Sequence, residues 1–358
     1  MDNEIKLSEI LSQIALTEGS NFQYEESAML AEKEHRASNQ SSLSIKILSI
    51  IGGFLATLTF LGFLAITGIY DSKISMVILG ILFIGGAIFI NLKTDHLLLD
   101  TISISIFAAG LALLVFGLSE MGLGEVVLSL IVMLISVLTM YSTKSYMLSF
   151  LSFAAISIAF ITILMTFDNF NLVHIYLALY TFLLCYWCLN ESKIISLHPK
   201  LNTLYNPIRI GLIIALFSGL IFIGARGIIG IQFNFIWLSS IVNAAALIYV
   251  VREICIVLEV QSQKTKLYVY ALSSLTIIIT FYSPAISGSI LVMLLCFLVN
   301  YKTGFGITII GLLYFISQYY YDLNLSLLTK SLLLFFSGIV FIAFYLFTNY
   351  MLKGNEKI

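Results

Sequence analysis

Long apolar stretches recur along the whole chain, and they constrain its fold more than any other feature. Nearly uncharged runs of about 17 residues or more follow one another between positions 47 and 350, and one such run can cross the ~30 Å hydrocarbon core of a bilayer as a helix. Of the 358 residues, 60% are hydrophobic and 10% are charged, against about 45–50% and about 25% in soluble domains. The sequence therefore predicts an all-α, polytopic integral membrane protein whose first partner is the lipid bilayer.

We predict about twelve transmembrane helices joined by short connections. Their ranges are 47–69, 74–91, 97–118, 124–141, 146–166, 171–190, 207–225, 234–251, 267–283, 285–301, 304–321 and 327–350. The 124–141 segment is short. The residues around Ser283 and Pro284 fit either two tightly joined spans or a re-entrant hairpin. Losing one span would reverse the orientation of every span that follows.

The distribution of basic residues predicts the orientation of these helices. With twelve spans, the side of the membrane that holds the N-terminus carries Lys6, Lys33, Arg36, Lys46, Lys93, Lys144, Lys193, Lys200, Arg209, Arg252, Lys264, Lys266, Lys302, Lys353 and Lys357. The opposite side carries Lys73, Arg226 and Lys330. Cytoplasmic loops are enriched in Lys and Arg. We therefore expect both termini to be cytoplasmic.

The two ends of the chain are polar. The predicted division is a cytoplasmic N-terminal tail at 1–45, a transmembrane domain at 46–350 and a C-terminal tail at 351–358. In the first tail Leu7, Ile10, Leu11 and Ile14 recur at helical spacing, which predicts a short amphipathic helix. Because acidic residues outnumber basic ones in this tail, we do not expect it to bind an anionic lipid surface. It is interpreted as a solvated tail, or as a helix that docks on the protein itself or on another membrane protein.

Charged side chains near helix ends are the candidates for chemistry. An ionised group near the centre of a membrane helix costs about 2.5–3.5 kcal/mol on insertion scales, so each one requires an explanation. His96 and Asp100 lie four residues apart, close enough to interact on one helix face. They fit a proton-linked acid with a titratable neighbour, or simply a polar helix start. Arg226, between glycines, fits either contact with an anionic substrate or a side chain that reaches the membrane surface.

Signatures of enzymes, metal sites and nucleic-acid binding were sought and not found. Cys185 and Cys188 have the spacing of a metal or redox pair, but no second Cys pair or His-rich partner accompanies them. The sequence has no phosphate-binding loop, no His-Glu-x-x-His and no Gly-x-Ser-x-Gly. Lys264 and Lys266 form the one basic cluster, which is too small to predict nucleic-acid binding. We therefore assign no catalytic residue, metal or cofactor.

The stretch Gln318-Tyr-Tyr-Tyr-Asp-Leu-Asn-Leu-Ser-Leu-Leu-Thr-Lys-Ser331 separates the last two apolar runs. In the predicted topology it is the last external connection, where tyrosines favour the membrane interface. Lys330 lies about one turn inside the twelfth helix, at an N-terminus and on the outer side. That position opposes both the helix dipole and the charge bias. A nearby anion would explain it, and the candidates are Asp322, a phosphate-bearing lipid or a soluble anion.

The same stretch carries a resemblance to a known family. Tyr320-Tyr-Asp-Leu-Asn-Leu-Ser-Leu-Leu-Thr-Lys-Ser331, followed by Ser337-Gly338 in an apolar run, resembles the C-terminal signature of bacterial membrane proteins grouped as DUF4401. The resemblance is most specific over about 304–350. It implies a multi-pass protein of the bacterial inner membrane, and it implies no activity. It also marks as motif positions Tyr320, Tyr321, Leu323, Leu327, Leu328, Lys330 and Ser331.

Three functions fit these observations. The first is binding or transport of a small or lipid-like anionic molecule, with Arg226, Asp322 and Lys330 at the outer mouth and Asp100 as a proton-linked acid. The second is a non-enzymatic scaffold for a partner protein. The third, and the weakest, is an enzyme that acts on a lipid-linked substrate. A transporter needs a polar cavity near the bilayer midplane, so a tightly packed dry core would count against the first function.

Overall fold

The structure is a computed structural model that describes residues 43–93, 97–167, 169–224, 233–281 and 283–322, with isolated positions from 328 to 342. It divides into two compact units, Met1–Leu58 and Thr59–Ile358. In the first unit the described residues belong to helix α3 (Leu43–Ile66). All features discussed below lie in the second unit.

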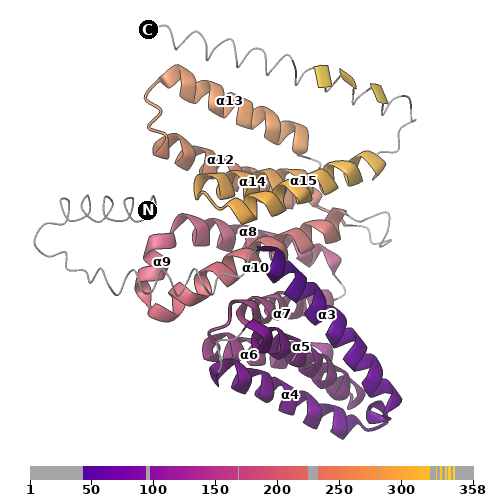
Figure 1. The fold of residues 1–358 in the computed structure, drawn as a ribbon. Helices are drawn as coiled ribbons and strands as arrows, with labels where there is room; N and C mark the ends of the chain where they lie inside the picture. Colours follow the sequence, from indigo (N-terminus) through magenta and orange to yellow (C-terminus); the bar gives the residue numbers. More distant parts are fainter. Residues whose placement is uncertain are drawn as a thin grey trace, which may run out of the picture. The chain divides into compact units, whose positions relative to one another are not determined.

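Every regular element in the described residues is helical (Figure 1). After α3 the α-helices are α4 (Lys73–Lys93), α5 (Leu97–Glu120), α6 (Glu125–Ser142), α7 (Tyr146–Met165), α8 (Val173–Leu189), α9 (Glu191–Leu197), α10 (Pro199–Gly224), α12 (Ile236–Val257), α13 (Gln263–Thr280), α14 (Pro284–Leu298) and α15 (Lys302–Asp322). Two short 3-10 helices, η2 (Ile69–Asp71) and η3 (Phe170–Leu172), precede α4 and α8. The all-α prediction is confirmed for this part of the chain.

Seven of the described helices are long and apolar enough to cross a membrane: α4, α5, α6, α7, α8, α10 and α12. They include α6, which occupies the short 124–141 range. Shorter apolar helices are Ile51–Leu64, within α3, and α14. The 15 residues of α14 extend over only about 22 Å at 1.5 Å per residue. These apolar helices are typical of a membrane protein. The predicted span 327–350 lies largely outside the described residues.

The connection between the predicted spans 171–190 and 207–225 is largely helical, so the predicted start of the second span at 207 is wrong. The connection contains α9 and the first two turns of α10, which begins at Pro199 rather than at 207. Proline is favourable at the first position of a helix because its φ is already close to the helical value. The polar start of α10 is then held by packing, since Tyr205 is 1% exposed. Pro207 also lies inside α10 and donates no backbone hydrogen bond there.

Helices α4 and α5 pack closely through glycines. A Cβ atom on Gly80 would lie 2.8 Å from the backbone nitrogen of Leu114 and 2.9 Å from the carbonyl oxygen of Gly110. A Cβ on Gly110 would lie 2.9 Å from Ile84 Cγ1. Small residues at a helix interface let two backbones approach, which is how membrane helices gain contact without a hydrophobic driving force.

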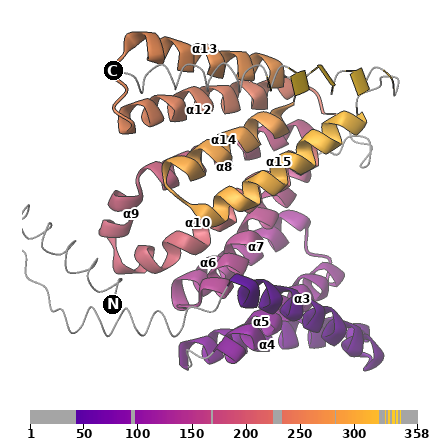
Figure 2. The ribbon, with the colours of Figure 1, turned by 45° about the horizontal axis from the view of Figure 1, so that its top comes forward.

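Helix α10 is the most deeply packed of the seven apolar helices. Of the apolar segment of α10, 67% is buried inside the protein, against 22% of the apolar segment of α6. Helix α10 contacts α7, α8, α9, α14 and α15, and it can be followed among them in Figure 2. The largest hydrophobic cluster of the described residues includes members of α8, α10, α12, α14 and α15. The core of the second unit therefore lies in its C-terminal part.

Candidate functional site

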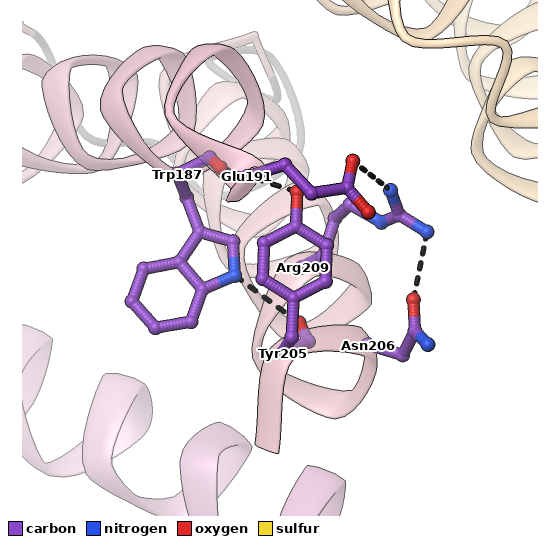
Figure 3. Close-up of polar contacts among 5 residues, drawn as sticks. All are labelled: Trp187, Glu191, Tyr205, Asn206 and Arg209. Atoms are coloured by element: carbon purple, nitrogen blue, oxygen red, sulfur yellow. Dashed lines mark hydrogen bonds and ion pairs between the residues drawn. The ribbon is translucent and has the colours of Figure 1, made fainter. Parts of the chain in front are cut away.

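A buried arginine on α10 forms the candidate site. Tyr205 and Asn206 precede Arg209 by four and three residues, so each is a neighbour of Arg209 on the helix surface. Arg209 is 8% exposed, which is unusual because a charged side chain loses its hydration on burial. Its Nη2 donates a hydrogen bond to Asn206 Oδ1 at 2.7 Å. Its Nη1 lies 3.6 Å from Glu191 Oε2. Figure 3 shows the guanidinium between these two oxygen atoms.

Two tyrosine rings flank the guanidinium. The Arg209 Cζ atom is 3.8 Å from the ring centroid of Tyr301 and 5.0 Å from that of Tyr205. Cation–π contact with an aromatic face is attractive, and it strengthens where water is excluded. The rings thus offset part of the desolvation of the charge. We call Glu191, Tyr205, Asn206, Arg209 and Tyr301 the arginine site.

Local structure places Tyr301 beside Arg209. Helix α14 ends in a Schellman motif, in which Tyr301 N donates to Cys296 O at 2.8 Å and Asn300 N donates to Phe297 O at 3.1 Å. Asn300 takes the left-handed conformation that this motif requires, with φ 51°. Gly304 leaves room for the Tyr301 ring, because a Cβ there would collide with it. The turn between α14 and α15 therefore brings Tyr301 to α10.

Trp187 holds the other tyrosine of the site. Its indole Nε1 donates to the carbonyl oxygen of Tyr205 at 3.1 Å, and the Tyr205 hydroxyl donates to the carbonyl oxygen of Trp187 at 3.2 Å. Their rings stack at 5.7 Å with an interplanar angle of 11°. Figure 3 shows the two side chains and the hydrogen bonds between them. Trp187 belongs to α8 and Glu191 to α9, so the α8–α9 corner and α10 are joined at this point.

The hydrogen bonding of Arg209 is incomplete. Its Nε atom is buried and has no hydrogen-bond partner among the described residues. The Glu191 side chain is 43% exposed, so its attraction to Arg209 is weakened by solvent. A buried donor without a partner costs about 1–3 kcal/mol, and more when it is charged. The arginine site can therefore accept one more oxygen atom, or exchange the Glu191 carboxylate for another anion.

A second polar region, formed by His174, Thr181, Ser239, Asn243 and Ser287, lies inside the C-terminal part; we call it the polar cluster. His174 Nε2 is 2.9 Å from the carbonyl oxygen of Asn234 and must be the donor in that hydrogen bond. His174 Nδ1 is 2.6 Å from Ser239 Oγ, a distance at which the two atoms share a hydrogen bond. This arrangement uses both ring nitrogens.

Asn243 joins three helices in the polar cluster. Its Oδ1 accepts from Thr181 of α8 at 3.4 Å. Its Nδ2 donates to the Pro284 carbonyl oxygen at 3.0 Å and lies 3.4 Å from Ser287 Oγ. Asn243 is 1% exposed, and its amide oxygen and nitrogen both have partners. The polar cluster is therefore typical of the hydrogen bonds that hold membrane helices together. It differs from the arginine site, where a buried nitrogen has no partner among the described residues.

Comparison with known proteins identifies the family. The model of the family described as "Domain of unknown function (DUF4401)" matches residues 42–351. The chain belongs to the DUF4401 family. No match was found among curated proteins or among solved structures. The DUF4401 match covers the described helices from α4 to α15, and so both the arginine site and the polar cluster.

Of the predicted charged site residues, Asp100 is the one whose side chain the structure describes. It is half-buried near the start of α5 in this DUF4401 protein, and its Oδ1 accepts from Asn91 Nδ2 at 3.0 Å. The Oδ1 of Asn91 in turn accepts from Lys144 N and Ser145 N, both at 3.3 Å. Asp100 thus helps to join α4, α5 and the connection between α6 and α7.

The other predicted residues are described only in part. His96, Arg226 and Lys330 lie outside the described residues, as do the motif positions Leu323 and Leu327. Asp322 is the last residue of α15, and its side chain is not described. Tyr320 is half-buried, and its ring meets that of Tyr321 at 5.6 Å. The side chains that are exposed are those of Tyr321, Leu328 and Ser331. The predicted outer mouth therefore stays a prediction.

The cysteine pair lies beside the arginine site. Cys185 and Cys188 are free thiols, both buried in α8. In the part of the chain that the structure describes, no group of three or more His, Cys, Asp and Glu side chains could hold a metal ion. Trp187, between the two cysteines, contacts the arginine site directly through its hydrogen bonds with Tyr205.

Proposed function

We propose that this DUF4401 protein binds a small or lipid-like anionic molecule, and that Arg209 is the cation that contacts it. The proposal includes a topology of twelve spans in the bacterial inner membrane with both termini cytoplasmic. The seven long apolar helices and the bias of Lys and Arg toward one side support this topology. In it, the arginine site faces the cytoplasmic side of the helices.

The observation that carries the proposal is the buried Nε atom of Arg209, which has no partner among the described residues. An ionisable residue inside a membrane protein marks a function more often than a structural role, because its burial is costly. A guanidinium has five N–H groups in a rigid fork that matches carboxylate and phosphate oxygens. An anion that reaches Nε would supply the missing acceptor.

Glu191 has the properties of a displaceable substitute for the ligand. Its carboxylate oxygen is 3.6 Å from Nη1, which is longer than the 2.7–2.9 Å of a strong charge-assisted hydrogen bond. Its half-exposed side chain can move into water at little cost. Binding would then exchange one carboxylate for another oxyanion at Arg209, while Asn206 and the two tyrosine rings stay in contact with the guanidinium.

A scaffold for a partner protein is the second candidate. The polar cluster favours it, since Asn243 and His174 are buried and hydrogen-bonded and no open polar passage is needed to explain them. A rigid bundle of this kind presents fixed surfaces. The two candidate functions differ in the role of Arg209. In a scaffold, Arg209 holds α10 to its neighbours through fixed contacts. In an anion-binding protein, Arg209 can exchange the Glu191 carboxylate for a ligand.

The test measures whether anions stabilise the full-length protein through Arg209. The thermal unfolding midpoint in detergent would be recorded with sodium phosphate, sodium acetate or phosphatidylglycerol, each against sodium chloride at equal ionic strength. A ligand that binds the folded state raises the midpoint. We expect a rise for at least one anion, a larger rise at the same concentration in Glu191→Gln, and none in Arg209→Gln.

Glu191→Gln keeps the test decisive if Arg209→Gln fails to fold. An exposed carboxylate that pairs with a cation contributes up to about 1 kcal/mol, so its removal should strengthen anion binding by up to about fivefold. Arg209→Lys keeps the charge and loses the fork, and should bind more weakly than the wild type. If none of the three anions stabilises Glu191→Gln beyond chloride, the proposal is wrong.

A further inference from the structure

A second basic site lies at the turn between α12 and α13, apart from the arginine site. A cavity of about 520 Å³ opens there, and its lining includes Arg252, Glu259, Gln261, Lys266 and Tyr270. Two cations, one acid, an amide and a phenol thus surround one space. Ligand-binding cavities in proteins measure about 300–1,000 Å³, so the volume suits a small polar group.

The turn that carries this lining is well defined. Helix α12 ends in a Schellman motif, with Val260 N donating to Cys255 O at 3.1 Å and Glu259 N donating to Ile256 O at 3.0 Å. Glu259 occupies the left-handed position, with φ 49°, where glycine is usual. A residue other than glycine in this conformation is strained, and such strain concentrates at binding sites. Ser262 then caps α13 by accepting from Thr265 N at 3.4 Å.

The charge of the lining favours an anion. Arg252 and Lys266 make no ion pair with any described residue, although both line the cavity with Glu259. The lining thus has a surplus of one positive charge. Gln261 and Tyr270 add an amide N–H and a hydroxyl that can donate to an oxyanion. This combination of a point charge, a guanidinium and neutral donors fits a phosphate group.

The surface around the turn is apolar, and this favours a lipid over a soluble anion as the ligand. Ile256, Val257 and Leu258 at the end of α12 are large exposed hydrophobic residues, as are Leu267 and Tyr268 at the start of α13. A soluble anion needs no such surface. A phospholipid does, because its acyl chains lie next to its phosphate. Basic pockets between membrane helices bind anionic lipid headgroups by this combination.

We propose that the cavity between α12 and α13 binds the phosphate of an anionic phospholipid, with Arg252 and Lys266 as the cations and the acyl chains against the exposed apolar residues of the turn. In this arrangement Tyr270 and Gln261 donate to the phosphate oxygens. Glu259 repels the headgroup and limits the affinity. The site is independent of Arg209, so it holds whether or not the arginine site binds an anion.

Lipid retention by the full-length protein tests the proposal. The purified protein would be mixed with phosphatidylglycerol or phosphatidylcholine in detergent, and bound lipids would be counted by native mass spectrometry. We expect preferential retention of phosphatidylglycerol. The double change Arg252→Gln and Lys266→Gln should weaken phosphatidylglycerol binding by on the order of tenfold or more. Each basic residue near a lipid headgroup contributes about a factor of five to the affinity.

Lys264→Gln is the matched control. Lys264 lies two residues from Lys266 on the same helix and is exposed, but it is not part of the cavity lining. It should retain phosphatidylglycerol as the wild type does. Glu259→Gln should retain more, and this gain remains measurable if the double variant fails to fold. Arg209→Gln should leave lipid retention unchanged, which separates this site from the proposed function.

Four results would overturn the lipid site. Equal loss in Lys264→Gln and Lys266→Gln would show general attraction of charge rather than a site. Equal retention of phosphatidylcholine, whose choline cation cancels the phosphate charge, would show that the site does not select lipids with a net negative headgroup. Displacement of phosphatidylglycerol by millimolar inorganic phosphate would identify a soluble anion as the ligand. An unchanged or reduced retention in Glu259→Gln would likewise contradict the arrangement.

Discussion

The helices from α4 to α7 and those from α8 to α15 use different means of packing. In the first group, the buried clusters are small and apolar, and α4 meets α5 through Gly80 and Gly110. In the second group, one large cluster surrounds buried hydrogen bonds and the arginine site. In the first group, close backbone contact joins α4 and α5, and the buried hydroxyls of Ser103, Thr139 and Ser152 donate to carbonyl oxygens of their own helices. In the second group, buried polar side chains bond from one helix to another, and Arg209 has a buried Nε atom without a partner among the described residues.

The largest effect is expected at the glycine contact of the first group. Gly80→Leu should destabilise the protein by about 3 kcal/mol, the upper part of the range for overpacking, because the nearest atoms are backbone and cannot move aside. Gly86→Leu on the same helix is the control, since a Cβ there meets nothing within 4 Å. Unfolding in detergent by added denaturing surfactant measures both. Equal losses in the two variants would refute the glycine contact.

A smaller loss is expected in the polar cluster of the second group. Asn243→Leu keeps the branched arrangement of the side-chain heavy atoms but leaves Thr181, Ser287 and the Pro284 carbonyl without its amide. Hydrogen bonds between membrane helices contribute about 0.6 kcal/mol each on average, so three contacts predict about 2 kcal/mol. Ser218→Ala removes only an exposed hydroxyl that bonds within its own helix, and should change stability by a few tenths. If Asn243→Leu left the stability unchanged, the hydrogen bonds of the polar cluster would not contribute to the stability of the protein.

Asp100 tests whether a polar contact also matters in the first group. Asp100→Asn retains an acceptor for Asn91 Nδ2 but exchanges one carboxylate oxygen for an NH2 group that accepts no hydrogen bond, and we expect a loss of about 1 kcal/mol. Asp71→Asn, at an exposed position, is the control. The same unfolding assay applies. If the two variants match, the contact between Asp100 and Asn91 contributes nothing to joining α4 and α5.

The smallest effect is expected at the surface pair of α4 and α5. Lys73 Nζ lies 3.8 Å from Glu120 Oε2, with both side chains more than half exposed, and it also donates to the Glu120 carbonyl oxygen. Lys73→Gln should therefore cost less than about 1 kcal/mol. Raising the salt concentration should shrink the difference from the wild type further, because exposed charges are screened. A loss as large as that of Asn243→Leu would contradict the ranking.

Apolar run length predicted most of the helices. Each predicted range from 47–69 to 304–321 contains a helix, because a run of that length can only be satisfied as a helix inside a bilayer. The start of α10 was not predicted, since residues 199–206 are polar and become helical by packing on Trp187. The number of spans also exceeds what length alone supports, as α14 has 15 residues.

The arginine site was not predicted from the sequence, for two reasons. Arg209 counted among the cytoplasmic charges, because the predicted span began at 207 and placed it at a membrane surface. The pattern Tyr205-Asn206-x-x-Arg209 was a local signal for an arginine held on one helix face. The contact with Tyr301 was not predictable, since it depends on a turn almost a hundred residues later. Of the predicted site residues, Asp100 has a described polar partner, and that partner, Asn91, was not predicted.

The most direct test of the central claim uses Trp187 as a reporter. The protein has two tryptophans, so Trp237→Phe leaves only Trp187, whose ring stacks on Tyr205 beside Arg209. Titration of this protein with the anion that stabilises it most, at constant ionic strength, should give a saturable change in Trp187 fluorescence. The change should shift to lower concentration in Glu191→Gln and vanish in Arg209→Gln. A signal that does not saturate, or that is the same in Arg209→Gln, would contradict an anion site at Arg209.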